Sequence, residues 1–237
     1  MKKMVTAALL LFGFAALQAQ VTFRPGIRAG VNFSHFTQGD LDMQNGAYTD
    51  SNTGLLVRVP NDEFNSKTDF YVGLYGALRL TRFYTLQPEV NYSRQGTKFD
   101  SYRYDSGIGA TRKISGQIDL SYVSVGIVNK FTFSNTFNIH VGPTIDVIME
   151  RSGDLDVPFN TTNDYYYDAV FYDTNSDVDL SFVLGLGINF TKNFGFEARV
   201  KKGIIPVMDW GDDHTNVVFS AGLVYTFDVS GATGSTN

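Results

Sequence analysis

From Arg24 onward, apolar and polar residues alternate along most of the chain with a period of two. This alternation is typical of β-strands whose two faces meet different surroundings. Residues 180–190 give the clearest case, since leucine, isoleucine and phenylalanine hold all the even positions. The pattern predicts eight strands, over residues 24–36, 70–80, 86–93, 114–133, 137–147, 180–190, 194–204 and 217–227.

The segment 114–133 departs from this regularity because its apolar residues change parity partway along. They are even before residue 121 and odd after it, namely Ile118, Leu120, Val123, Val125 and Ile127. One extra residue in a strand pair moves the following side chains to the opposite face. We therefore expect a β-bulge near Ser121.

The connections between the predicted strands alternate between short and long. The short ones are 81–85, 134–136 and 191–193, and the long ones are 37–68, 100–113, 150–177 and 206–214. Up-and-down β-barrels of bacterial outer membranes have short turns on the periplasmic side and long loops outside. The sequence therefore predicts an all-β fold, an eight-stranded antiparallel up-and-down transmembrane β-barrel.

A soluble eight-stranded barrel would alternate in the same way, but the aromatic residues favour a membrane barrel. They gather at the short-turn ends of separate strands, as a girdle at a membrane interface does. The members of this girdle are Phe23, Phe83, Tyr84, Phe131, Phe133, Phe137, Phe190, Phe194, Tyr225 and Phe227.

The polar face of the strands mixes glycine, serine and asparagine with charges of both signs. Such a face suits a narrow barrel interior that side chains fill. Buried charges need partners, so we expect a structural charge network, with Glu89 and Glu197 each facing a cation. An ion path or binding site is the alternative. The expected members are Arg28, Arg79, Glu89, Asp146, Glu197, Arg199 and Lys201.

Composition narrows the function classes further. Beyond the N-terminal segment, no apolar run reaches the about 18 residues of a membrane-spanning helix, so strands must do any spanning. The absence of cysteine excludes lipid attachment, thiolate metal sites and thiol catalysis. A formal net charge of −5 argues against a nucleic-acid partner.

Residues 1–19 resemble a secretory signal peptide, with Lys2 and Lys3 before an apolar stretch and Ala19 before the cut. Its removal changes the formal net charge from −5 to −7, with 17 basic against 24 acidic residues. We expect a signal peptide over 1–19, the barrel over 20–228, and a short flexible tail over 229–237.

The connection 150–177 is rich in aromatic residues. Exposed aromatic side chains suit contact with a protein or glycan partner, although a variable surface loop is the simpler interpretation. Its acidic residues could bind calcium, but EF-hand spacing is absent. The candidate contact residues are Tyr165, Tyr166, Tyr167, Phe171 and Tyr172.

Acidic residues and a histidine at the predicted barrel rim are loosely similar to the omptin proteases, which activate water between such pairs. They are Asp154, Asp156, Asp212, Asp213 and His214. His35 and His140 have no partner at metal-ligand spacing. The sequence carries no nucleophile elbow or phosphate loop, and we expect no catalytic residue, metal or cofactor.

Five short motifs follow one another along the predicted strands. They are Gly-Val-Asn-Phe-Ser at 30–34, Gln-Pro-Glu-Val-Asn-Tyr-Ser-Arg-Gln-Gly at 87–96, Tyr-Val-Ser-Val-Gly at 122–126, His-Val-Gly-Pro at 140–143 and Phe-Glu-Ala-Arg-Val at 196–200. In their order and spacing they resemble the PorT-like outer-membrane β-barrel family of Bacteroidetes. In the third motif, Ser124 and Gly126 replace a glutamate and a proline that are usual in the family.

This resemblance covers nearly the whole chain after the signal peptide. It implies an eight-stranded barrel in the lipid bilayer of the cell outer membrane, but no common activity. The namesake is associated with type IX protein secretion. We therefore expect a non-enzymatic integral barrel with a structural or surface-interaction role. The alternatives are an accessory component of a type IX secretion machine and an outer-membrane hydrolase.

Overall fold

The computed structural model describes residues 22–37, 47–50, 52–58, 62–105, 107, 109–134, 136–156, 174, 176–207 and 214–229. The expected signal peptide and residues 230–237 of the expected tail lie outside this range. No helix in the described residues is long and apolar enough to cross a membrane.

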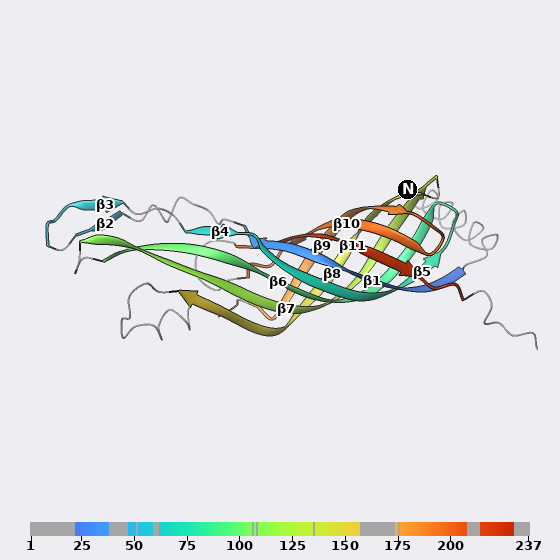
Figure 1. Cartoon of the computed structure of the whole chain (residues 1–237), viewed down its shortest axis with the longest axis horizontal. Coiled ribbons are helices and arrows are strands. Elements are labelled where there is room, and N and C mark those ends of the chain that lie inside the picture. Colours follow the sequence, from blue (N-terminus) through green and yellow to red (C-terminus); the bar gives the residue numbers. More distant parts are fainter. Residues whose placement is uncertain are drawn as a thin grey trace, which may run out of the picture.

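Eight long strands form a closed ring (Figure 1). Each pairs antiparallel with the strands before and after it, and the last strand pairs with the first. The predicted eight-stranded antiparallel up-and-down barrel is therefore confirmed. The strands are β1 (Thr22–Phe36), β5 (Lys67–Arg79), β6 (Tyr84–Asp105), β7 (Ala110–Phe133), β8 (Phe137–Asp156), β9 (Val178–Asn189), β10 (Phe194–Gly203) and β11 (Asn216–Thr226).

Three short strands lie in the connection between β1 and β5. Two of them, β2 (Ala47–Thr49) and β3 (Leu56–Arg58), pair with each other as a separate two-stranded sheet. The third, β4 (Glu63–Asn65), pairs with residues 98–100 of β6. The long connection after β1 thus adds structure at the long-loop end of the ring.

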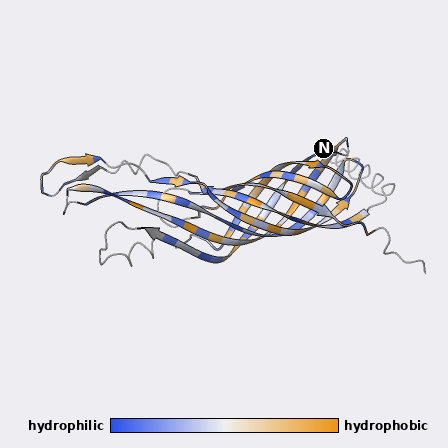
Figure 2. Cartoon of the chain, in the orientation of Figure 1, coloured by the Kyte–Doolittle hydropathy of each residue, from blue (hydrophilic) through white to orange (hydrophobic). Residues whose placement is uncertain are grey.

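The two faces of each strand differ in chemistry, as Figure 2 shows by the alternating colours along the strands. In β9, the odd residues from Asp179 to Gly187 are buried, and the even residues from Val178 to Ile188 are exposed. The exposed set is entirely apolar, which suits a surface that faces hydrocarbon. The interior is largely polar, which explains the period of two in the sequence.

Aromatic side chains surround the short-turn end of the ring. Nine of the ten expected girdle residues are exposed, and Tyr84 is half-buried. Several stand in pairs across one turn or strand pair, for example Phe190 and Phe194 with ring centroids 5.9 Å apart. Aromatic rings prefer the polar–apolar boundary of a bilayer, so this end of the barrel marks one membrane interface.

The strand register shifts between Ser121 and Tyr122, at the position where we expect a bulge. The extra residue is in β8, however, because Ser121 pairs with Glu150 and Tyr122 with Ile148, which leaves Met149 between them. In β7 itself the even residues stay inside throughout the described span, so its parity does not change.

The apolar residues change parity because the interior becomes apolar at the long-loop end. There, buried side chains from several strands form one cluster, which we call the plug. The plug consists of Phe36, Phe99, Ile118, Leu120, Tyr122 and Val207, with Phe64 and Ile148 packed against it. The even face of β7 therefore points inward along its whole length. It is apolar at the long-loop end and polar further along the barrel.

The prediction of a long loop over residues 100–113 is wrong. β6 and β7 pair without interruption from Tyr84–Phe131 to Asp105–Ala110, so a short turn joins them. The polar residues in this stretch belong to the two strands of a protruding sheet and therefore do not mark a loop. Likewise, β8 continues to Asp156, past the predicted end of its strand.

The pairing of β5 with β6 stops at Ser93, so β6 and β7 continue past the barrel wall (Figure 1). We call their protruding part, residues 97–105 and 110–118, the outer hairpin. Figure 1 shows that β2 and β3 lie at the far end of this hairpin.

Gly96 marks the place where the outer hairpin leaves the barrel. Its φ is 143°, and its N–H donates to Ser34 Oγ at 2.8 Å. A Cβ at this position would lie 1.9 Å from the Ile118 carbonyl oxygen. A glycine is needed here because backbone strain and a steric overlap coincide.

Gly96→Ala is expected to lower the free energy of unfolding by about 1–3 kcal/mol, the cost of a strained backbone residue. Urea unfolding of the refolded barrel in detergent micelles measures this change. Gly54→Ala is the matched control, since Gly54 also has positive φ, 68°, but no atom lies within 4 Å of the added Cβ. Equal effects of the two substitutions would contradict the role of the overlap at Gly96.

Candidate functional site

A buried group of charged side chains lies inside the barrel at the inward positions of four strands. Arg28 of β1 stands between two carboxylates: its Nη1 lies 2.9 Å from Glu89 Oε2, and its Nη2 lies 2.7 Å from Glu197 Oε2. All three residues are at most 3% exposed. Charge-assisted bonds of this length are among the strongest that side chains make.

Two more cations complete this group. Arg199 Nη1 contacts Glu89 Oε1 at 2.9 Å, and Arg199 Nη2 contacts Glu197 Oε2 at 3.0 Å. Lys130 Nζ lies 3.3 Å from Glu197 Oε1. We call Arg28, Glu89, Lys130, Glu197 and Arg199 the inner cluster. Its three cations enclose two carboxylates, so each carboxylate has at least two cationic partners.

A second ion pair lies nearer the long-loop end. Lys201 Nζ contacts Asp146 Oδ2 at 2.6 Å, and the Ser181 hydroxyl donates to the same oxygen at 2.8 Å. Asp179 lies beside them and accepts from the Ser181 hydroxyl at 3.3 Å, and the backbone N–H groups of Ile204 and Ile205 donate to its Oδ1 at 3.2 and 3.1 Å. Paired charges therefore extend along the interior of the barrel.

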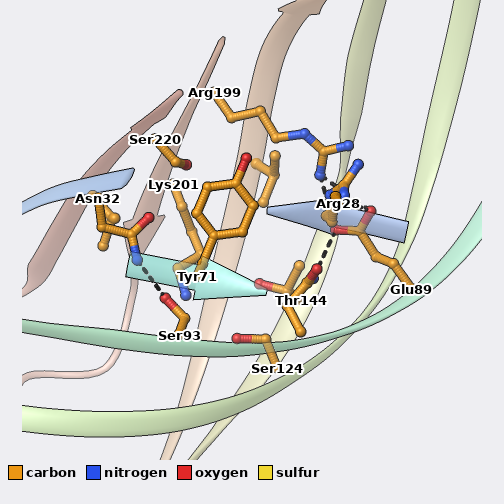
Figure 3. A pocket seen from close by; sticks show the side chains of 13 residues that line it. Arg28, Asn32, Tyr71, Glu89, Ser93, Ser124, Thr144, Arg199, Lys201 and Ser220 are labelled. Carbon is orange, nitrogen blue, oxygen red and sulfur yellow. Dashed lines mark hydrogen bonds and ion pairs between the residues drawn. The ribbon is translucent and has the colours of Figure 1, made fainter. Parts of the chain in front are cut away.

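Residues of the inner cluster and Lys201 line a small cavity in the barrel (Figure 3). Its volume is about 50 Å³, which is room for a few water molecules. Ser124 Oγ and Thr144 Oγ1 line it and are buried without a hydrogen-bond partner among the described residues. Water in this cavity would satisfy both hydroxyls.

Six of the seven residues expected in the interior network lie there, and Arg79 does not. Arg79 is exposed at the end of β5, where its Nε donates to the Thr81 carbonyl at 3.3 Å and its Nη2 to the Arg82 carbonyl at 3.2 Å. It has the inward parity, but the strand reaches the turn before the side chain can enter the barrel. The prediction that Arg79 belongs to the interior charge network is therefore wrong.

Sequence reasoning missed two members of the site, Lys130 and His140. His140 is fully buried, with Nε2 3.4 Å from Glu197 Oε1, and it also bonds to Asn138. Both residues have the even parity that points inward in β7 and β8. This parity is the signal in the sequence that identifies Lys130 and His140 as interior residues.

The structure describes only some of the rim residues that suggest a hydrolase. Asp154 is exposed on β8, whereas His214 is only 6% exposed. His214 Nδ1 donates to the Thr37 carbonyl at 2.7 Å, and its ring centroid lies 4.8 Å from that of Phe64. Asp212, Asp213 and the side chain of Asp156 lie outside the described residues.

The loop residues Tyr165, Tyr166, Tyr167, Phe171 and Tyr172 also lie outside the described residues. In the part of the chain that is described, no group of three or more histidine, aspartate or glutamate side chains could hold a metal ion.

The outer hairpin is fixed by its own polar contacts. Asp100 accepts from Ser115 Oγ at 2.7 Å and pairs with Lys113 Nζ at 3.0 Å. The Ser115 hydrogen bond, followed by that of Lys113, lowers the pKa of Asp100 below its ordinary value. The hydrogen bond to Asp100 in turn raises the pKa of Lys113. Both shifts favour the ion pair at neutral pH.

The connection after β1 is tied to the same hairpin. Asp62 Oδ1 accepts from Ser101 Oγ at 2.9 Å and pairs with Arg103 Nη1 at 3.2 Å. Nearer the tip, the Tyr104 hydroxyl donates to Asp50. These contacts connect β2, β3 and β4 to β6, so the long-loop end carries one continuous structure.

Comparison with known proteins gives a family but no activity. The model of the outer membrane protein beta-barrel domain family matches residues 18–209. Among curated proteins, none matches the sequence. The fold also resembles that of several solved structures.

Neisserial surface protein A shares 12% identity, with 88% of this chain and 100% of that chain covered and a TM-score of 0.45. Ail of Yersinia pestis shares 13% identity, with 86% of this chain and 98% of that chain covered and a TM-score of 0.38. The outer membrane protease OmpT of Escherichia coli shares 13% identity, with 89% of this chain and 99% of that chain covered and a TM-score of 0.39. These likenesses are too distant to transfer an activity.

The family match covers most of the chain, and the closed ring with its apolar outer surface agrees with it. The chain belongs to the outer membrane protein β-barrel domain family and resides in the outer membrane.

Proposed function

We propose that this protein is a non-enzymatic barrel that anchors the outer hairpin at the cell surface, with a surface-interaction or structural role. The observation that carries the proposal is the unbroken pairing of β6 with β7 up to Asp105–Ala110. The hairpin continues past Ser93, where the pairing with β5 ends, and past Ser115, where the pairing with β8 ends, so its tip is available to whatever approaches the cell.

The side chains that fill the barrel interior support an anchoring role and not a pore. The inner cluster fills one section of the interior, and the plug fills the section at the long-loop end. Eight-stranded barrels leave room for side chains and little else. A water-filled path for solutes would have to displace both groups.

The fixed shape of the outer hairpin supports an interaction role. Ion pairs at Asp62, Asp100 and Asp105 hold the described part of it. A surface that is already ordered loses less conformational freedom on binding. We propose that the partner is a protein or glycan, and that the aromatic residues 165–172 take part in its binding.

Within the family, we propose a relationship to the PorT-like barrels of Bacteroidetes, because the motif at 87–96 forms the part of β6 that carries Glu89. A signal peptide over 1–19 and a tail over 229–237 belong to the same proposal. The burial of His214 speaks against a hydrolase that uses this histidine.

Cysteine labelling tests this arrangement, because the natural sequence has no cysteine. Thr111→Cys places a thiol near the tip of the outer hairpin, and Thr136→Cys places one in a short turn; both positions are exposed. A membrane-impermeant maleimide is expected to label Thr111→Cys in intact cells. It is expected to label Thr136→Cys only after the outer membrane is permeabilised.

The reverse pattern, or equal labelling in intact cells, would contradict surface display of the hairpin. A photo-crosslinking residue at position 111 then tests the interaction role, with the same residue at position 136 as the control. A partner captured specifically at position 111 supports surface interaction. If none is captured, the proposal is restricted to a structural role.

A further inference from the structure

A groove lies on the outer surface of the barrel, near the long-loop ends of β9 and β10. Its volume is about 1060 Å³. Apolar side chains from β9, β10 and the connection after β10 form most of its wall with one lysine, and Thr37, Gly203 and Thr215 line the rest. The apolar residues and the lysine are Phe182, Leu184, Val200, Lys202, Ile204 and Pro206.

Lys202 is an isolated cation on an apolar surface. It is exposed, and its partners in the sheet are Phe182 on one side and Val217 on the other. The outward positions before and after it on the same chain are Val200 and Ile204. Among the described residues, no acidic side chain forms an ion pair with Lys202.

This lysine differs from its neighbour Lys201, which points inward and pairs with Asp146 at 2.6 Å. A lysine on the lipid face is costly at the middle of the bilayer, and the cost falls to about 0–1 kcal/mol near the interface. Its long stem lets the ammonium group reach the headgroup level. At that level the available counter-charge is a lipid phosphate.

The position of Lys202 in β10 agrees with such a partner. β10 begins at Phe194, in the aromatic girdle, and ends one residue after Lys202, at Gly203. Lys202 therefore lies at the opposite interface, where outer-leaflet headgroups meet the barrel. The groove walls continue the apolar surface of the barrel at Leu184 and Val200, below the lysine.

We propose that this groove is a binding site for an outer-leaflet lipid with an anionic phosphate headgroup. The phosphate binds Lys202, and an acyl chain lies against Phe182, Leu184 and Val200. Among the described lining residues, a free phosphate ion would have Lys202 as its one charged partner, which gives little affinity. A lipid adds the burial of its acyl chain in the groove, which a free ion lacks.

Native mass spectrometry tests the proposal on the full-length mature barrel, taken from nanodiscs of dimyristoyl phosphatidylglycerol and phosphatidylcholine in equal amounts. We expect the protein to retain phosphatidylglycerol in preference to phosphatidylcholine. Lys202→Gln should reduce the retained phosphatidylglycerol about fivefold, the contribution of one lysine near an anionic surface. Lys202→Arg should restore it, because the charge is kept.

Lys192→Gln is the matched control, since Lys192 is an exposed lysine at the other rim of the barrel and lines no part of the groove. An equal loss of lipid in both glutamine variants would mean general membrane electrostatics and would overturn the proposal. Unchanged retention in Lys202→Gln would overturn it as well. Displacement of the lipid by millimolar inorganic phosphate would show an ion site and would also contradict a lipid site.

Discussion

Replacing Glu197 by glutamine is expected to lower the free energy of unfolding of the barrel by about 3–5 kcal/mol, the usual cost of breaking a buried ion pair. Glu197 is 2% exposed and contacts Arg28, Arg199 and Lys130. Glutamine keeps the size of the side chain but not its charge. Arg28, Arg199 and Lys130 would then have Glu89 as the one carboxylate of the inner cluster.

Urea titration of the barrel refolded into lipid vesicles measures this loss. Glu150→Gln is the control, because Glu150 is exposed, and a surface substitution of this kind costs less than about 0.5 kcal/mol. A second substitution tests the cause: Lys130→Met in the Glu197→Gln background removes one surplus charge and should recover part of the stability. Equal stability of Glu197→Gln and Glu150→Gln would refute the structural role of the inner cluster.

Replacing Leu74 by arginine is expected to destabilise the barrel by about 2–4 kcal/mol when it is folded into a bilayer. Leu74 is 64% exposed on the outer surface and pairs with Ile27 and Val90, in the middle part of β5. A guanidinium group there must either enter hydrocarbon or draw water and headgroups toward itself. Both are costly, and the paired neighbours Ile27 and Val90 are apolar and cannot offset the charge.

Unfolding titrations in vesicles of a single lipid measure the effect of Leu74→Arg, with Thr68→Arg as the depth control. Thr68 is also exposed on β5, but it lies next to the first residue of the strand, at the long-loop end. The cost of arginine at the interface is about 0–1 kcal/mol. If the two arginine substitutions cost the same, the apolar surface around Leu74 does not face lipid.

The sequence predicts the barrel well because each wall strand separates lipid from a polar interior. Leu184 and Gly185, for example, face opposite sides, and the alternation survives through all of β9. The prediction is wrong where the surroundings change along a strand. In the outer hairpin, Tyr102 and Arg103 face opposite sides of a protruding sheet, yet both are polar enough to suggest a loop.

The charged interior is harder to predict than the strands, since parity gives the direction of a side chain but not its depth. Arg28 and Glu89 have the inward parity and lie in the middle of their strands, and they meet inside. Arg79 has the same parity but lies at a strand end, so it remains outside the barrel. Contacts between distant strands, such as Lys130 with Glu197, depend on barrel tilt, which a single sequence does not reveal.

The closure of the ring through β1 and β11 determines when during synthesis the barrel can form. Gly26 pairs with Thr226, so the joining strands are the first and the last to leave the ribosome. Contacts so distant in sequence form slowly. Until β11 arrives, β1 and β10 would expose unpaired backbone groups, which hydrocarbon does not tolerate. A partly synthesised chain therefore gains nothing from the membrane, and the whole chain must be carried there unfolded before any of it can insert.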